Sequence, residues 1–246
     1  LPGVKGCWSL RVGDAATSDT YLVTTFIGET RILAINDDDE LDETEFEGFS
    51  AEEQTLATCN VDGGFIAQVT GTGVRLVDAA TGALRAKWSP PDGATVSVAA
   101  ANRTQVLVAT TGGALVSLAA GTGVGGGGDG GGGGGEAMDT GGEDNDGVGG
   151  GGLLREVATT ELGHEIACLD CSPLTDPGAA SATLCAVGTW SMEVCVLTMP
   201  DLRRVTSAPL HTAEVIPRAV LLCAFEGTPY LLAGLGDGQL LTFNLD

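Results

Sequence analysis

The residues with the most suggestive spacing for chemistry are Cys168 and Cys171, in the stretch Cys168-Leu169-Asp170-Cys171. A pair of cysteines separated by two residues is typical of half a zinc site or of a redox-active dithiol. A structural zinc site needs further ligands, and the sequence holds no second pair with this spacing. Residues three apart in a strand lie on opposite faces, so we predict that both thiols are packed in a core.

Other catalytic patterns are equally weak. The chain contains 2 histidines, and the zinc-protease and nucleophile-elbow motifs are absent from the sequence. Gly121, Gly123 and Gly126 match a dinucleotide-binding pattern, but the match lies in a glycine tract that no helix follows. The sequence therefore predicts a protein that is not an enzyme, with no catalytic, cofactor-binding or metal-binding residues.

A strongly acidic run extends from Asp37 to Glu53 and contains ten carboxylates, with Phe46 and Phe49 among them. Its order of residues does not fit a calcium-binding loop. We interpret the run as a solvated loop between strands, and the alternative is a surface that steers a basic partner.

The charge of the whole chain excludes several partners. Its 246 residues carry 33 acidic and 11 basic side chains, which gives a formal net charge of −22. Binding to phosphate backbones or anionic lipids requires clustered basic residues, so we expect no direct contact with nucleic acid or membranes. No apolar run approaches the ~20 residues of a membrane span.

A repeat organises the rest of the chain. Five segments share the pattern of a short apolar strand, a glycine-containing turn and a second apolar strand: residues 20–35, 65–79, 105–119, 183–197 and 230–245. We assign Gly28, Gly71, Gly112, Gly188 and Gly236 to the turns. Their spacing is in the low forties once an insertion between the third and fourth segments is removed. This is about the length of one four-stranded β-propeller blade.

The insertion spans residues 121–152, which hold 19 of the 39 glycines, six acids and no basic residue. Such a composition predicts a disordered loop. Further strands are expected at 55–61, 95–101, 165–171 and 219–225, one before each later hairpin. The sequence thus predicts an all-β chain, a partial propeller over residues 1–246 with about five antiparallel four-stranded blades of a seven-bladed ring. The alternative is a five-bladed ring.

Particular residues then suggest a family. The start LPGVKGCWSLR, the acidic run DDDELDETEFEGF, the stretch HEIACLD at 164–170, the triplet GTW at 188–190 and the C-terminal segment from Ile216 to Leu245 resemble the large subunits of the UV-damaged-DNA-binding complex. Members of this family are adaptors of cullin-4 RING ubiquitin ligases and contain three seven-bladed propellers. The resemblance is to the middle propeller and covers most of the chain. The insertion and the early end, which omits about two blades, depart from the family pattern.

The resemblance implies a function in DNA repair and substrate ubiquitination. The middle propeller would bind the cullin-4 N-terminal domain, while the other propellers of the same protein hold substrate receptors. Glu165 and Trp190 match family residues at the cullin contact. The resemblance also implies a nuclear protein that is present in the cytoplasm as well. The alternative is a propeller of a pre-mRNA cleavage and polyadenylation factor or a splicing factor with the same three-propeller architecture.

Overall fold

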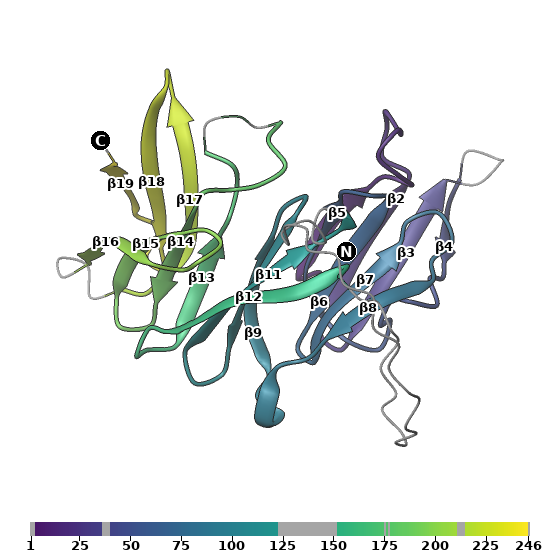
Figure 1. The fold of residues 1–246 in the computed structure, drawn as a ribbon, viewed down its shortest axis with the longest axis horizontal. Helices are drawn as coiled ribbons and strands as arrows, with labels where there is room; N and C mark the ends of the chain where they lie inside the picture. The colour runs from purple at the N-terminus through teal and green to yellow at the C-terminus, as the bar shows by residue number, and fades with distance from the viewer. Residues whose placement is uncertain are drawn as a thin grey trace, which may run out of the picture.

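Five antiparallel sheets follow one another along the chain in the computed structural model, which describes residues 3–35, 40–122, 152–174, 176, 178–210 and 215–245. Figure 1 shows them side by side in chain order. We call them blades 1 to 5: β1–β4, β5–β8, β9–β12, β13–β16 and β17–β19. Each sheet is a simple meander, as expected of propeller blades. The predicted all-β propeller is confirmed.

The strands of different blades correspond by their order within the blade. The first strands are β1 (Gly6–Leu10), β5 (Thr55–Val61), β9 (Val96–Ala101), β13 (Ile166–Asp170) and β17 (Pro217–Phe225). The second strands are β2 (Tyr21–Phe26), β6 (Phe65–Thr70), β10 (Gln105–Thr110), β14 (Leu184–Thr189) and β18 (Thr228–Leu235). The third strands are β3 (Glu29–Ile35), β7 (Gly73–Asp78), β11 (Ala114–Ala120), β15 (Glu193–Thr198) and β19 (Leu240–Asn244). The fourth strands are β4 (Leu41–Thr44), β8 (Leu84–Trp88), β12 (Leu154–Glu161) and β16 (Arg204–Pro209), and one short 3-10 helix, η1 (Pro91–Gly93), precedes β9.

The core consists of four apolar layers, one between each pair of neighbouring blades. Strand β10 is buried along its whole length, and its sequence does not alternate between apolar and polar residues. Val106 and Val108 face blade 2, whereas Leu107 and Ala109 face blade 4. A strand that is buried on both faces reads as a continuous apolar run. Since first strands of adjacent blades contact one another, they are the innermost strands of the propeller.

The meander gives each blade two ends with different roles. The turns between second and third strands lie at one end, together with the links that lead into the next blade, and we call this end the turn face. The links that follow the first strands lie at the other end, which we call the loop face. Hydrogen bonds join each kind of segment across blades, for example from Val96 N–H to the Gly71 carbonyl on the turn face (2.9 Å).

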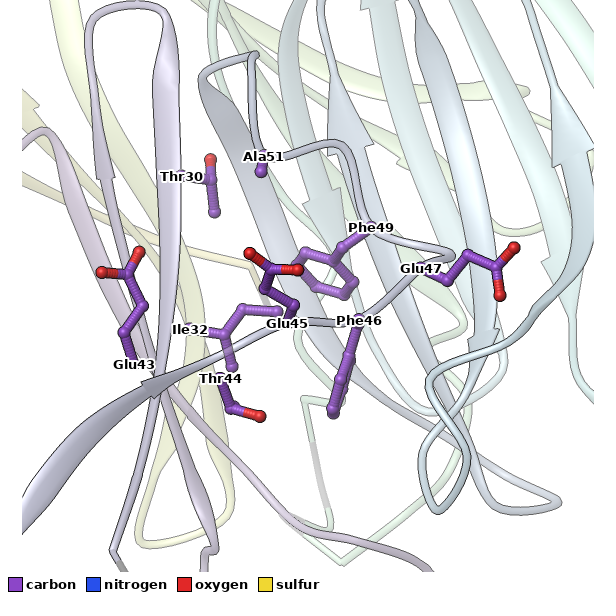
Figure 2. A pocket seen from close by; sticks show the side chains of 9 residues that line it. All are labelled: Thr30, Ile32, Glu43, Thr44, Glu45, Phe46, Glu47, Phe49 and Ala51. Atoms are coloured by element: carbon purple, nitrogen blue, oxygen red, sulfur yellow. The ribbon is translucent and has the colours of Figure 1, made fainter.

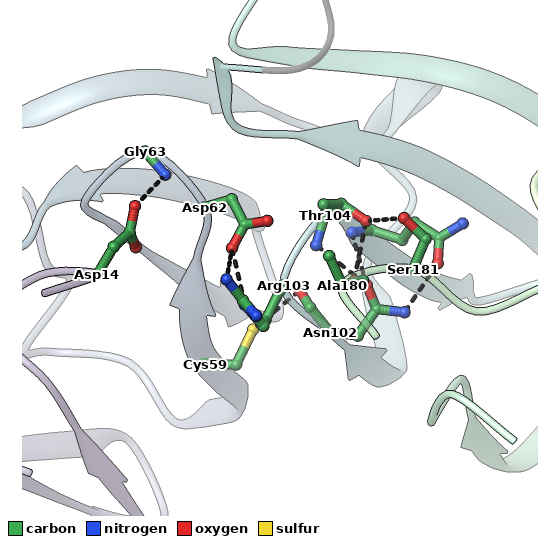
Figure 3. Close-up of polar contacts among 10 residues, drawn as sticks. Asp14, Cys59, Asp62, Gly63, Asn102, Arg103, Thr104, Ala180 and Ser181 are labelled. Atoms are coloured by element: carbon green, nitrogen blue, oxygen red, sulfur yellow. Dashed lines mark hydrogen bonds and ion pairs between the residues drawn. The ribbon is translucent and has the colours of Figure 1, made fainter. Parts of the chain in front are cut away.

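Polar contacts tie the blades together on the loop face (Figure 3). The Asp14 carboxylate accepts a hydrogen bond from the Gly63 N–H (2.8 Å), and Arg103 forms an ion pair with Asp62 (2.6 Å). The Thr104 hydroxyl lies 2.7 Å from that of Ser181. These contacts join blades 1 to 4 in succession, so the loop face restrains the relative positions of the blades.

Three sequence predictions need correction. The acidic run is not simply a loop, because Leu41–Thr44 forms β4 and pairs with β3. Phe49, inside the run, is 7% exposed and packs against Ile66 of blade 2. Blade 5 has three strands within the described residues rather than four.

The third correction concerns Gly188, which lies inside β14 and not in the turn. A Cβ atom at this position would lie 2.6 Å from Cys168 Sγ and 2.8 Å from Pro217 Cγ. Glycine is therefore required by close packing between strands and blades, and not by turn geometry.

The predicted insertion at 121–152 lies outside the described residues from 123 to 151. Among the described residues, no helix has the length and apolar character that a membrane crossing needs.

Candidate functional site

Glu165 and Trp190 come from the two ends of one strand pair in blade 4. Glu165 directly precedes β13, and Trp190 directly follows β14. These strands are antiparallel with Ile166 opposite Thr189, so their ends meet on the turn face. The Trp190 N–H donates a hydrogen bond to the Glu165 carbonyl oxygen (2.9 Å). The structure therefore brings the two predicted residues together.

The turn that carries Trp190 is fixed by local hydrogen bonds. The Thr189 hydroxyl lies 2.8 Å from the Ser191 hydroxyl and accepts the Glu193 N–H (3.3 Å). Met192 adopts a left-handed backbone with φ of 60°, and its N–H donates to the Thr189 carbonyl (3.1 Å). Trp190 lies at the tip of this turn and is 52% exposed. A large, partly exposed aromatic on a rigid turn is well suited to binding a partner.

Glu165 has a role that the sequence did not reveal. Its Oε1 accepts a hydrogen bond from the N–H of Gly112 (2.7 Å), in the turn between β10 and β11 of blade 3. The neighbouring Gly113 leaves no room for a side chain, since a Cβ would lie 2.6 Å from the His164 carbonyl oxygen. Glu165 thus holds the turn of one blade against the entry of the next, while its side chain stays exposed to solvent.

The two residues border a groove of about 530 Å³, lined by Ser97, Val98, Glu165, Ile166, Ala167 and Trp190. We call this the Trp190 groove. It lies between β9 and β13, the innermost strands of blades 3 and 4. Its lining is mostly apolar, with one carboxylate at its edge. It can receive an apolar side chain of a partner while Glu165 accepts a hydrogen bond from a neighbouring Lys or Arg.

Sequence reasoning missed the blade 3 residues of this groove. Ser97 and Val98 belong to β9, and Gly112 belongs to a turn 53 residues away from Glu165. No local pattern in the sequence joins these positions. The signal that could have found them is the blade repeat, because it places each turn beside the entry to the next blade.

The cysteine pair behaves as the alternation predicts. Cys168 packs between blades 4 and 5, whereas Cys171 packs between blades 3 and 4. Burial raises the pKa of the Cys168 thiol to about 11, and burial also raises the pKa of Cys171 well above its usual value. Thiols in such surroundings are poor nucleophiles and poor metal ligands. Within the described ranges, no group of three His, Cys, Asp or Glu side chains is arranged to hold a metal ion.

The sequence is similar to those of known proteins over its whole length. A sequence model of the family described as RSE1/DDB1/CPSF1 second beta-propeller matches residues 1–125 and 148–246, so the match is interrupted within the predicted insertion. DNA damage-binding protein 1b of Arabidopsis thaliana is 44% identical over 247 residues, and DNA damage-binding protein 1 of Solanum lycopersicum is 42% identical over 246. DNA damage-binding protein 1 of Drosophila melanogaster is 38% identical over 248 residues. Each match covers 100% of this chain and 19 to 20% of the relative, so the chain spans about a fifth of the length of these proteins.

Proposed function

The chain belongs to the RSE1/DDB1/CPSF1 second β-propeller family, and from that premise we propose that it is the cullin-docking propeller of a ubiquitin-ligase adaptor. The observation that carries the proposal is the half-exposed Trp190 beside Glu165 on the turn face. In this proposal the chain is a non-catalytic scaffold, and the Trp190 groove receives the N-terminal domain of cullin-4.

The groove has the physical features of a docking site. Aromatic anchors at the centre of an interface each contribute about 2 to 4 kcal/mol to binding, because their rings lose contact with water when a partner covers them. The strand ends that carry Glu165 and Trp190 are held in place by the pairing of β13 with β14 and by the Glu165 to Gly112 contact. A preorganised surface loses little conformational entropy on binding.

The wider role is part of the same proposal. Several of the relatives carry the name DNA damage-binding protein 1, and this favours a function in DNA repair over one in pre-mRNA processing. Substrate receptors would then bind to other propellers of the same protein. We expect this adaptor in the nucleus and also in the cytoplasm, and imaging of a fluorescent fusion tests that expectation.

Calorimetry with a purified cullin-4 N-terminal domain tests the docking. Circular dichroism first establishes that each variant has the β-sheet signal of the parent chain. We expect micromolar or tighter binding by the parent and a loss of about 30-fold or more for Trp190→Ala, which corresponds to about 2 kcal/mol. Val205→Ala is the matched control, since Val205 is 57% exposed in β16 of the same blade and does not border the groove.

Two results would contradict the proposal. The Trp190→Ala chain could be folded and bind the cullin domain as tightly as the parent, which would remove Trp190 from the contact. Alternatively, the folded parent could bind no cullin but recover polyadenylation or splicing subunits in a pull-down, which would support the RNA-processing alternative.

A further inference from the structure

A second groove lies on the turn face, between blades 1 and 2, and its volume is about 500 Å³ (Figure 2). Its lining comes from β3, from β4 and from the link that enters blade 2. We call it the acidic groove, and we define it by Ile32, Phe46, Phe49, Glu43, Glu45 and Glu47. This volume is typical of sites that hold several side chains or a small ligand.

The floor of the acidic groove is apolar and rigid. Ile32 and Phe49 are 5% and 7% exposed and belong to the core layer between blades 1 and 2. Phe46 packs edge-to-face against Phe49, with ring centroids 5.9 Å apart, and against Tyr21 at 4.9 Å. The rings therefore present a fixed surface to whatever enters the groove.

Carboxylates line the groove above this floor. Glu43, Glu45 and Glu47 are all exposed, and the described residues give them no hydrogen bond or ion pair. Glu43 does interact electrostatically with the guanidinium of Arg31. In Figure 2 the carboxylates of Glu43 and Glu45 point upward and the ring of Phe49 lies beside Glu45, whereas Phe46 points downward and Glu47 to the right. A nearby carboxylate has a different role, because Glu53 Oε2 accepts hydrogen bonds from Ser50, Thr70 and Thr72.

An apolar floor next to exposed carboxylates that accept no hydrogen bond among the described residues suits one class of side chain. The methylene groups of arginine or lysine pack on aromatic and aliphatic surface, and the cationic end is attracted to carboxylates and to aromatic rings. An arginine can also bind a carboxylate through two parallel hydrogen bonds. Phosphate groups of nucleic acids or lipids would be repelled by the same carboxylates.

A second copy of this chain is a poor occupant. Its net charge of −22 opposes self-association. Arg11, Arg31, Arg85, Arg103, Arg203 and Arg204 are already engaged in ion pairs with the chain's own acids. The occupant that fits is a basic segment of another protein.

We propose that the acidic groove between blades 1 and 2 binds an arginine- or lysine-bearing segment of a partner protein, through Glu43 and Glu45 and the apolar floor that includes Phe49. The groove is lined by blade 1 and its link into blade 2, whereas the Trp190 groove is lined by blades 3 and 4. Binding at one site therefore does not depend on binding at the other.

Fluorescence anisotropy tests the proposal with a fluorescein-labelled peptide, Gly-Gly-Arg-Leu-Arg-Gly-Gly, and with the same peptide carrying citrulline in place of arginine. Citrulline keeps the shape of arginine but has no charge. We expect Glu45→Gln to weaken binding of the arginine peptide about fivefold or more. Glu52→Gln is the matched control, because Glu52 is exposed in the same link and does not line the groove. It should change the affinity less than about twofold.

The controls distinguish peptide binding in the acidic groove from general attraction of a basic peptide to an acidic protein. Equal weakening by Glu45→Gln and Glu52→Gln would overturn the proposal, since only net charge would then matter. Equal binding of the citrulline peptide, or no binding of the arginine peptide to the folded parent, would also overturn it. Trp190→Ala should leave peptide binding unchanged, so failure of this proposal and failure of cullin docking are distinguishable.

Discussion

The two grooves on the turn face are built from different strands of the blade and expose opposite chemistry. In the Trp190 groove the aromatic side chain is exposed, and the carboxylate of Glu165 is bonded to the neighbouring blade. In the acidic groove the aromatic side chains form the floor, and the carboxylates are exposed. One surface is suited to burying apolar area and the other to attracting positive charge.

This difference arises because strands and connections are under different constraints. The inner strands of a blade pack against neighbouring blades on both sides, so their residue types are set by the core. Turn and link residues that face solvent, such as Trp190 and Glu45, have no such demand, and a single change of residue there alters what the face presents. A propeller can therefore carry two unrelated recognition surfaces on one face without a change of fold.

The largest expected effect tests the support beneath the Trp190 groove. Gly188→Ala places a methyl group 2.6 Å from Cys168 Sγ and 2.8 Å from Pro217 Cγ, in the packing between blades 4 and 5. We expect the free energy of unfolding to fall by about 1 to 3 kcal/mol, as for other overpacked sites. Urea unfolding measures the change. Gly13→Ala, at a position with no atom within 4 Å of the new Cβ, should change stability by less than about 0.5 kcal/mol. Equal effects of the two substitutions would show that blade 4 tolerates the added volume.

Salt dependence should separate the two grooves next. Mobile ions screen attraction between exposed charges but have little effect on apolar burial. Raising the salt concentration from about 50 to about 500 mM should weaken arginine-peptide binding about tenfold, and cullin binding less than about threefold. Anisotropy and calorimetry measure the two affinities. If the affinities of both ligands fell equally with salt concentration, charge would contribute equally to binding in the two grooves.

Much of the fold could be predicted from the sequence, because blade strands are short, apolar and regularly repeated. The predicted strand at 55–61 coincides with β5, and the opposite faces of Cys168 and Cys171 follow from strand alternation. Strand β4 was missed because its composition, Leu-Asp-Glu-Thr, is polar. An outer strand packs on one side only, so it lacks the apolar signal on which the prediction depended.

Candidate site residues were harder to predict than strands. The family resemblance pointed to Glu165 and Trp190, but the contact from Glu165 to Gly112 joins segments of two blades. Such a contact depends on three-dimensional arrangement and leaves no local pattern. The acidic groove was missed for a different reason. Phe46 and Phe49 lie within a run dominated by acids, so no pattern in the sequence indicated that their rings pack in the core.

Substitutions of Glu165 should have a smaller effect on stability. Comparing two of them separates the hydrogen bond that Glu165 accepts from its negative charge. Glu165→Gln keeps an oxygen that can accept the Gly112 N–H, whereas Glu165→Ala removes it. Because the residue is exposed, we expect the alanine variant to lose only about 0.5 to 1 kcal/mol of stability and the glutamine variant less. Thermal unfolding measures the difference. If both variants bind the cullin domain equally weakly, the charge matters; if only the alanine variant is impaired, the position of the turn matters.

The smallest effect concerns Glu53, whose carboxylate accepts three hydrogen bonds, whereas that of Glu45 accepts none among the described residues. Burial raises its pKa, but hydrogen bonds from Ser50, Thr72 and Thr70 outweigh burial and hold the pKa below its ordinary value. A carboxyl group with a lowered folded-state pKa contributes stability above its ordinary value of about 4.3 and loses that contribution as the pH falls through the folded-state pKa. Glu53→Gln should therefore be less stable than the parent at pH 7, by about 1 kcal/mol or less because the group is partly exposed.

Chemical unfolding between pH 7 and about pH 3 tests this expectation. The difference between parent and Glu53→Gln should shrink as the pH falls below about 4.3, because protonation of Glu53 removes the acceptor that the hydroxyl groups prefer. Glu45→Gln provides the contrast, since its carboxylate has no partner among the described residues and its loss should not lower stability at any pH. A constant difference for Glu53→Gln down to pH 3 would mean that its charge does not stabilise the link, and the distinction between the carboxylates of Glu53 and Glu45 would no longer hold.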